Sequence, residues 1–422
     1  MRRFGLAFWL ALGLLAAGCG GGDDGGGGGG QAGADRDKPA NLTYWATEND
    51  QEIVTIKQIV DSCQQKLPNI KVTVQQQAFE GAQQKFATAA QGGSAPDIMR
   101  SEVAWVADYA SQGFLRPLDD YVSEQDKSDY LPSALAYDQY EGKLWGVPQV
   151  TDALALLYNK RLLEDKGIAQ PPATMDEFKT AIEKFNDGKT FGFYMRGDSY
   201  WLQPFIWAYG GGLVDVSNKQ VLVNNPQSVQ GVQFVSDLVK SPGVVKNRDF
   251  ANDYDNAMTA FKTGKVAMIF NGPWSTTDVL TGKEFSDKSN LGIAPIPSGP
   301  GGQGSPVGGH NYTVYAGTKA PDQSYAFIEC MNSAENQALL AEKHNLLPTR
   351  KSAYSNAKVT GNPLVAGFQG VMEKATARPV HPAGGAIYTD FTPAWQQVYA
   401  GKSTPQEAMD KVAKAWQQLY KF

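Results

Sequence analysis

The chain has 422 residues, of which 42% are hydrophobic and 19% are charged, and its formal net charge is -5. This length exceeds what one ordinary hydrophobic core occupies, so we expect two lobes. The acidic balance comes without a basic stripe or an arginine-rich arm, which argues against a protein that binds the phosphate backbone of nucleic acid.

The N-terminus has the features of an export signal. Two arginines precede an apolar run, residues 4–17, which is too short for a comfortable membrane span. Small residues then lead to Cys19, which is similar to a bacterial lipoprotein signal, in which this cysteine is lipid-modified. Ala16 stands where such signals usually carry Leu, so an ordinary secretory cut stays an alternative. We predict a signal peptide at residues 1–18.

Residues 19–39 are dominated by glycine, with an unbroken run at residues 25–30, and can bury no core. We interpret them as a flexible tether, and a coil of about 20 residues reaches about 25 Å. A lipid on Cys19 and this tether together predict an exported protein on the outer face of the cytoplasmic membrane, extracellular or periplasmic.

The folded chain is predicted to begin with a strand at residues 41–45. Apolar residues then recur at helical spacing over residues 53–67, and residues 70–74 alternate as a strand. A helix-like segment, residues 82–91, ends at two glycines. Strand and helix alternate in this part of the chain, which favours a largely parallel sheet.

A tight hairpin is predicted at residues 140–148 and a buried strand at residues 153–158, with residues 149–152 between them as a candidate crossing between lobes. Further along, Thr174 and Glu177 form a capping box at the start of a helix. Alternating strands and helices continue from there, which indicates a second α/β unit.

The most informative stretch is residues 266–278. Five apolar residues predict a strand buried on both faces, an Asn-Gly-Pro sequence breaks it, and Ser275 with Asp278 resembles a helix N-cap. Trp274 is thereby placed on a strand-to-helix turn, where ligands dock in open α/β sheets. Two interpretations of its indole stay open: packing on its own helix, or a flat platform for the apolar face of a sugar ring.

Later in the chain, residues 308–311 and residues 378–382 are candidates for a second and a third crossing. Cys63 and Cys330 are 267 positions apart, without the spacing of a metal site or a redox motif. In an oxidising compartment a disulfide and two buried thiols both stay open. The disulfide is slightly preferred, because both cysteines lie on predicted helices of the same lobe.

Motifs of nucleophilic, metal and phosphate chemistry are missing from the sequence. It has no G-x-S-x-G and no H-E-x-x-H, and two tripeptides that resemble the end of a phosphate loop lack its first glycine. What remains is carboxylates, arginines and aromatic residues on turns. Carboxylates accept hydrogen bonds from sugar hydroxyls, arginine donates to sugar oxygens, and aromatic faces pack on the apolar side of the ring. We expect no cofactor and no metal.

Several short segments occur in a characteristic order. The most specific are the run from Val147 to Lys160 and the turn Asn271-Gly272-Pro273-Trp274, and the softer ones are Tyr44-Trp45, Ala95-Pro96-Asp97-Ile98, Gly308-Gly309-His310-Asn311 and Leu347-Pro348-Thr349-Arg350. Together they resemble the extracellular carbohydrate-binding proteins of bacterial ABC importers, and within these the maltose, maltodextrin and trehalose/maltose group. The resemblance spans about residues 40–422.

This resemblance implies a two-lobed α/β fold, the type II-like periplasmic-binding-protein fold. Each lobe is a mostly parallel sheet flanked by helices, and the ligand cleft lies between the lobes. We expect an N-terminal lobe of residues 40–150 with 311–376 and a C-terminal lobe of residues 151–310 with 377–422. The implied function is a high-affinity monomeric receptor, not an enzyme, that closes around maltose- or maltodextrin-like α-glucosides and delivers them to the transmembrane subunits of an ABC permease.

The resemblance also implies the residues that hold the sugar. Trp274 matches the stacking Trp of the family, Asp152 matches its acidic residue on the first crossing, and Glu102 falls where trehalose/maltose-type members carry Asp. The full predicted set is Glu48, Asn49, Gln83, Glu102, Asp152, Asp198, Tyr200, Trp201, Trp274, Gly309, His310, Arg378 and Tyr388.

The sequence departs from its relatives at some positions. Some members have Trp where His310 stands, and the linear-maltodextrin type carries a lysine near Asp50 and a Trp near Ser101, so the sugar and its length stay open. The main alternative is a secreted glycoside hydrolase acting on α-glucans, with Glu102 and Asp152 flanking the bond. A surface-structural lipoprotein is a third interpretation.

Overall fold

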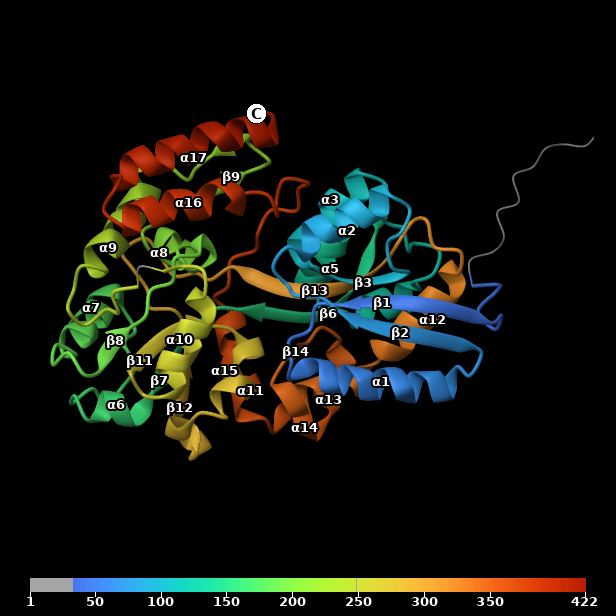
Figure 1. Ribbon diagram of the computed structural model, residues 1–422, viewed down its shortest axis with the longest axis horizontal. Helices are drawn as coiled ribbons and strands as arrows, with labels where there is room; N and C mark the ends of the chain where they lie inside the picture. Colours follow the sequence, from blue (N-terminus) through green and yellow to red (C-terminus); the bar gives the residue numbers. More distant parts are fainter. Residues whose placement is uncertain (1–32, 248) are drawn as a thin grey trace, which may run out of the picture.

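Residues 33–247 and 249–422 are described here from a computed structural model of the chain, shown in Figure 1. Two main sheets organise them, a six-stranded sheet in the order β14-β6-β13-β3-β1-β2 and a four-stranded sheet in the order β12-β7-β11-β8. We call the part built on the six-stranded sheet, on the right of Figure 1, the first lobe, and the part on the left the second lobe. The predicted two-lobed α/β class is confirmed.

The first lobe has helices on both faces of its sheet. Helices α1, α12 and α13 cover one face and α2 with α3 cover the other (Figure 1). The elements are β1 (Ala40–Ala46), α1 (Glu52–Lys66), β2 (Ile70–Gln76), α2 (Ala82–Gln91), β3 (Ile98–Glu102), α3 (Val106–Ser111), β6 (Gly146–Ala153), β13 (Val307–Val314), α12 (Pro321–Met331), α13 (Ala334–His344) and β14 (Leu347–Pro348).

The second lobe is centred on β11 (Val266–Asn271), whose six residues are all buried, as the apolar run predicts. Around it lie β7 (Ala155–Asn159), α6 (Lys160–Glu164), α7 (Met175–Glu183), β8 (Phe191–Phe193), α8 (Gln203–Ala208), α9 (Pro226–Leu238), α10 (Asp253–Lys262), α11 (Thr276–Val279), β12 (Leu291–Ala294), α16 (Tyr388–Tyr399) and α17 (Pro405–Tyr420). Short elements connect the rest, namely α4 (Glu124–Asp129), α5 (Pro132–Leu135), β4 (Gln139–Tyr140), β5 (Lys143–Leu144), β9 (Val214–Asp215), β10 (Gln220–Val221), α14 (Ala357–Thr360) and α15 (Pro363–Met372).

The sheets are mixed, so the expectation of mostly parallel strands is wrong in this detail. Parallel pairing joins β1 to β2 and β3, and β8 to β11. The pairs β13–β3, β13–β6, β14–β6, β11–β7 and β12–β7 are antiparallel. The reason is the crossing chain: one extended segment passes from β6 into β7, and it pairs with its neighbours in the opposite direction in both lobes.

The candidate first and second crossings lie side by side. Strand β13 runs back along β6, so that Asp152 is opposite Gly308 and Val150 is opposite His310, with a register shift just after His310. The third passage joins them, because the amide of Val307 donates to the Thr376 carbonyl at 3.0 Å. Three segments distant in sequence therefore meet between the two sheets.

Local predictions were confirmed where short-range contacts decide the structure. Strands β4 and β5 form the predicted hairpin, and Thr174 with Glu177 forms a complete capping box. Ser275 occupies the predicted N-cap position of α11, but its side chain does not cap the helix. Its hydroxyl donates to the Gly272 carbonyl at 2.8 Å, inside a 3-10 turn at Pro273–Ser275, and accepts nothing from α11.

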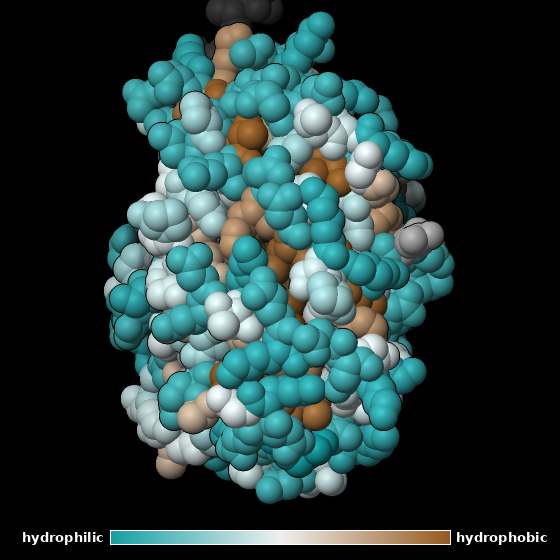
Figure 2. Space-filling view, turned by 90° about the vertical axis from the view of Figure 1, so that its left-hand side faces the viewer, coloured by the Kyte–Doolittle hydropathy of each residue, from teal (hydrophilic) through white to brown (hydrophobic). Residues whose placement is uncertain are grey.

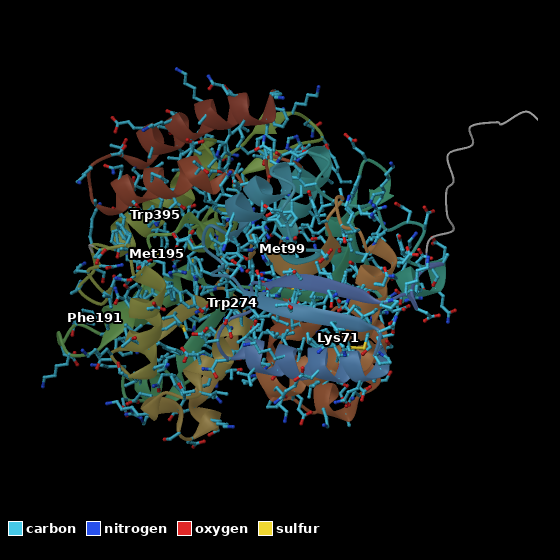
Figure 3. The ribbon with its side chains drawn as sticks, turned by 45° about the vertical axis from the view of Figure 1, so that its right-hand side comes forward. Lys71, Met99, Phe191, Met195, Trp274 and Trp395 are labelled. Atoms are coloured by element: carbon cyan, nitrogen blue, oxygen red, sulfur yellow. A yellow bond between two sulfur atoms is a disulfide. The ribbon has the colours of Figure 1, made fainter. Side chains whose placement is uncertain are left out.

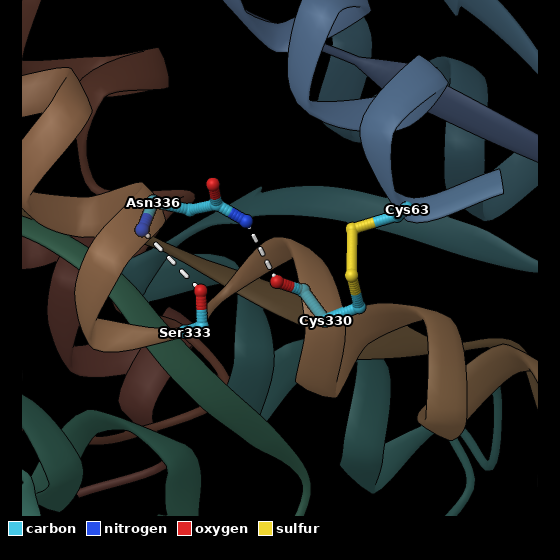
Figure 4. The surroundings of a disulfide bond; sticks show 4 residues. All are labelled: Cys63, Cys330, Ser333 and Asn336. Carbon is cyan, nitrogen blue, oxygen red and sulfur yellow. Dashed lines mark hydrogen bonds between the residues drawn. A yellow bond between two sulfur atoms is a disulfide. The ribbon is translucent and has the colours of Figure 1, made fainter. Parts of the chain in front are cut away.

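A disulfide joins Cys63 on α1 to Cys330 on α12, with the two Cα atoms 5.9 Å apart (Figure 4). The separation lies in the usual range for a disulfide. The Cys330 carbonyl accepts a hydrogen bond from Asn336 Nδ2 at 2.8 Å, which ties the bridge to α13. Of the two states left open by the sequence, the structure has the disulfide, and it is internal to the first lobe.

The signal peptide, Cys19 and most of the tether lie outside the described residues. Within residues 33–247 and 249–422 no helix has the length and apolar character to cross a bilayer. On the side of the second lobe shown in Figure 2 the surface is largely hydrophilic, and apolar side chains show only in small, separated areas.

Candidate functional site

An ion pair lies where the three passages meet. Glu102, at the end of β3, accepts a hydrogen bond from Arg378 Nη2, and Arg378 Nε donates to the Val307 carbonyl at 2.9 Å. Burial opposes the charge of this arginine, yet Glu102 and nearby tyrosine hydroxyls raise the pKa of Arg378 well above its usual value. The site therefore has a fixed cation.

Asp152 lies beside this pair on β6. A Cβ added to Gly308 would come within 2.2 Å of Asp152 Oδ1 and 3.0 Å of the Tyr200 hydroxyl, so glycine at this position lets the carboxylate and the phenol converge. Burial and the charge of Glu102 raise the pKa of Asp152 to about 7, against the effect of Arg378. A hydroxyl that donated to this carboxylate would favour its charged form.

Aromatic hydroxyls from the second lobe complete this cluster. Gln203 Nε2 donates to the Tyr388 hydroxyl at 3.0 Å, and Arg378 Nη1 approaches the same oxygen at 3.5 Å. The Tyr200 ring lies 5.8 Å from the Arg378 guanidinium and 6.2 Å from the Tyr388 ring. The cluster therefore brings hydrogen-bond donors, acceptors and ring faces close together.

Trp201 and Asp198 support the neighbouring turn. Asp198 Oδ1 accepts from the Tyr200 amide at 2.8 Å and so caps the 3-10 turn Ser199–Trp201. The Trp201 indole is buried, donates to a β11 carbonyl, and lies 3.7 Å from the guanidinium of Arg196. Arg196, which the sequence interpretation missed, also forms an ion pair with Asp253 at 3.4 Å. No motif in the sequence points to it.

Trp274 lies at the boundary of the lobes, as Figure 3 shows, and packs against the hydrophobic cores of both. Its half-buried indole folds back over Gly272, because a Cβ there would come within 1.8 Å of the ring. Asn49 Nδ2 from the first lobe donates to the Trp274 carbonyl at 3.3 Å. The indole therefore packs on its own turn and also takes part in the junction between the lobes.

Asn49 and Glu48 are adjacent in sequence but differ in position. Asn49 is exposed and caps α1, since its Oδ1 accepts from the Glu52 amide at 2.9 Å. Glu48 is buried in the first lobe, where it accepts from the Tyr44 hydroxyl at 2.7 Å and lies 3.4 Å from Arg100 Nε. Its carboxylate is therefore part of a buried polar network within the first lobe. Arg100 was missed, although residues 100 and 102 share one face of a strand.

The remaining predicted residues lie on the first-lobe side. Gln83 is next to the segment that leads into α16, because a Cβ on Gly385 would come within 2.9 Å of the Gln83 amide. Gly309 has a φ of 141°, and a Cβ there would be 2.3 Å from the Val150 carbonyl oxygen, so glycine is required. Burial lowers the pKa of His310 well below its usual value, and neither of its ring nitrogens has a hydrogen-bond partner among the described residues.

The structure thus gathers a central cluster, with other predicted residues on the rim or beneath it. The cluster is Glu102, Asp152, Tyr200, Gly309, His310, Arg378 and Tyr388, together with Gln203, which was missed. Among the described residues no group of three or more His, Cys, Asp or Glu side chains is placed to hold a metal ion.

Comparison with known proteins places this geometry in a family. A family model described as "Bacterial extracellular solute-binding protein" matches residues 58–367. A putative binding protein of Brucella abortus is 26% identical over 361 residues, which cover 82% of this chain and 85% of the relative.

Solved structures agree. The GacH receptor of Streptomyces glaucescens, solved unliganded and in complex with acarbose and an acarbose homolog, is 42% identical, with a TM-score of 0.87 over 91% of this chain and 99% of that chain. The maltotriose-binding protein of Thermus thermophilus, bound with maltotriose, is 27% identical, with a TM-score of 0.77 over 89% of this chain and 100% of that chain. Both likenesses confirm the relationship predicted from the sequence. The chain belongs to the bacterial extracellular solute-binding protein family.

Proposed function

We propose that this protein is a sugar receptor that binds an α-linked glucosyl oligosaccharide of the maltose or maltodextrin class between its lobes and delivers it to an ABC import permease. The observation that carries the proposal is the buried cluster of Glu102, Asp152, Arg378, Tyr200 and Tyr388, in which each polar group suits a sugar hydroxyl or ring oxygen. Similarity to receptors solved with acarbose and with maltotriose supports the sugar class.

The chemistry divides between the two sides of the cleft. The carboxylates of Glu102 and Asp152 accept hydrogen bonds from hydroxyls, and Arg378 donates to sugar oxygens. The rings of Tyr200 and Trp274 pack on the C–H faces of the pyranose. Such a site binds its ligand chemically unchanged.

Contacts from both lobes explain how binding would be signalled. Only the closed arrangement gives the sugar all of its partners, so the ligand shifts the population toward that arrangement. Strands β6 and β13 are paired in the first sheet, and β6 leads directly into β7 of the second sheet, so this crossing is where we expect bending. The closed monomer is the form that the permease would recognise.

The start of the described chain supports a tethered protein. The Asp35 amide donates to Asp322 Oδ2 on α12 at 2.8 Å, and Gln323 Nε2 donates to the Asp35 carbonyl at 2.7 Å. An ion pair between Arg36 and Glu329 lies beside them. In Figure 1 this segment meets the first lobe at the end away from the second lobe. A lipid on Cys19 would therefore hold the first lobe and leave the second free to move.

Isothermal titration calorimetry of the mature protein with maltose, maltotriose, trehalose, sucrose and cellobiose tests the proposal. We expect saturable binding of the α-glucosides, a raised melting temperature with the same sugars, and no glucose released from maltotriose. Absence of binding to every sugar would refute the receptor, and release of glucose would favour the glycoside hydrolase.

A further inference from the structure

Phe79 is an exposed aromatic residue on the loop between β2 and α2. Among the described residues, it and Val54 are the large hydrophobic side chains that remain exposed, at 51% and 57%. The Phe79 ring is stacked on Trp105, with centroids 5.3 Å apart and an angle of 24° between the planes, and it meets His310 edge-on at 5.8 Å. Its exposed part is therefore one side of an ordered aromatic group.

The strand order shows where this group lies. The first sheet runs β13-β3-β1-β2, so β2 is its edge strand. Trp105 follows β3 and His310 lies on β13, which means that the loop carrying Phe79 turns back over the ends of β1 and β3. Loops at the carboxyl ends of parallel strands are where ligands bind in such sheets. The Phe79 ring therefore lies beside His310, which belongs to the central cluster.

The segment that leads into α16 also contacts this aromatic group. A Cβ on Gly385 would lie 3.1 Å from Trp105 Cδ1, so this segment reaches the base of the group. The two ring nitrogens of His310, which contacts the Phe79 ring, are buried and have no hydrogen-bond partner among the described residues.

We propose that Phe79, held by Trp105 and His310, is a stacking platform for an outer sugar ring and makes the receptor prefer oligosaccharides of three or more rings to disaccharides. This inference rests on the proposed sugar-binding function. We expect three contact positions for the sugar, carried by different elements: the Trp274 turn beside Asn49, the Asp152 and Arg378 pair, and the Phe79 platform. A disaccharide has too few rings to occupy all three at once.

The experiment compares Phe79→Ala with Val54→Ala, a matched truncation of the other exposed hydrophobic residue, on α1. Isothermal titration calorimetry would measure the affinity of each variant for maltose and for maltotriose. We expect Phe79→Ala to weaken maltotriose binding by about threefold to tenfold, the range for a lost aromatic contact, and to leave maltose binding unchanged. Val54→Ala should change neither affinity, and Phe79→Trp should restore the preference.

Equal losses for both sugars, or no loss for either, would overturn the inference while leaving the proposed function intact. A wild-type protein that binds neither sugar would instead refute the proposed function. Because the Phe79 side chain is half exposed, we expect both variants to fold, and thermal unfolding checks this. Phe79→Leu keeps apolar volume but has no ring, so it tests whether the ring itself is needed. It should behave like Phe79→Ala.

Discussion

Arg350 and Arg378 are both buried, at 7% and 8% exposure, and both guanidinium groups lie near a tyrosine ring, yet their surroundings differ. The partners of Arg350 all belong to the first lobe: its Nε donates to the Asn332 carbonyl at 2.7 Å and its Nη2 to the Tyr130 hydroxyl at 2.8 Å. Its Nη1 forms an ion pair with Asp126 at 2.6 Å.

Arg378 instead connects separate parts of the molecule. It pairs with Glu102 from the first lobe and approaches Tyr388 at the start of α16 in the second, while Asp152 stays close by with a raised pKa. Burial and charge therefore do not distinguish the two arginines. The difference is that the partners of Arg350 belong to one lobe, whereas those of Arg378 come from both lobes.

The largest effect is expected for Arg350→Met. Removing this buried guanidinium leaves the partly buried carboxylates of Asp126 and Asp129 without their partner, which costs about 3 kcal/mol of unfolding free energy, the lower end of the range for a buried pair. Urea denaturation would measure this loss, and the folded fraction should bind maltotriose as the wild type does. Arg161→Met is the control: this arginine is exposed, so the loss of its pairs should cost less than about 1 kcal/mol. A lower affinity in folded Arg350→Met would contradict the comparison.

Arg378→Met comes next and should act mainly on binding. Losing hydrogen bonds from a charged donor costs about 1.5–3 kcal/mol, so we expect the affinity for maltotriose to fall by about tenfold to a hundredfold. Its loss of stability should be smaller than that of Arg350→Met. Calorimetry of both variants would test this, and an unchanged affinity would show that Arg378 is only structural.

The third prediction concerns pH. A sugar hydroxyl favours the charged form of Asp152, whose pKa is about 7 in the free protein, so affinity should fall by up to about tenfold for each unit below pH 7. Asp152→Asn should remove this dependence. Titrations between pH 5.5 and pH 8, values chosen to span about one unit or more on each side of that pKa, would measure the slope.

Stability should respond to pH in the opposite sense. A carboxyl with a raised pKa binds an extra proton in the folded state between about pH 4 and pH 7, so stability should decrease as pH rises through that range. Burial also raises the pKa of Glu52 to about 7, in the first lobe, so it adds the same slope. Glu52→Gln should therefore reduce the slope of stability but not that of affinity. If Glu52→Gln changed the slope of affinity and left the slope of stability unchanged, the assignment of Asp152 to the site would be contradicted.

The smallest effect is expected for Trp274→Phe, which keeps a ring but reduces its area. We expect maltotriose affinity to fall by about threefold and the change in tryptophan emission on binding to be lost. Trp145→Phe is the matched control, because Trp145 lies on the β4–β5 hairpin side and donates to the Tyr140 carbonyl at 2.8 Å. If both variants lost the emission change equally, Trp274 would not report on the cleft.

Much of the site was predicted from the resemblance, because Asp152, Trp274 and Arg378 fall at positions that match the family. The structure brings these three residues to the junction of the lobes. Arg196 was not predictable, since its position depends on stacking against Trp201 and pairing with Asp253, and neither contact leaves a local pattern. The burial of Glu48 depended likewise on Arg100, which is distant in sequence.

The sequence by itself determined the elements that depend on short-range contacts: the buried β11 strand, the β4–β5 hairpin, the capping box at Thr174 and the alternation that indicates two α/β lobes. Only the tertiary structure decided that Cys63 bonds to Cys330, that Arg196 pairs with Asp253, and that the crossing strands pair antiparallel. The reason is physical: periodicity and capping act over a few residues, whereas these choices depend on which distant surfaces become neighbours once both cores are packed.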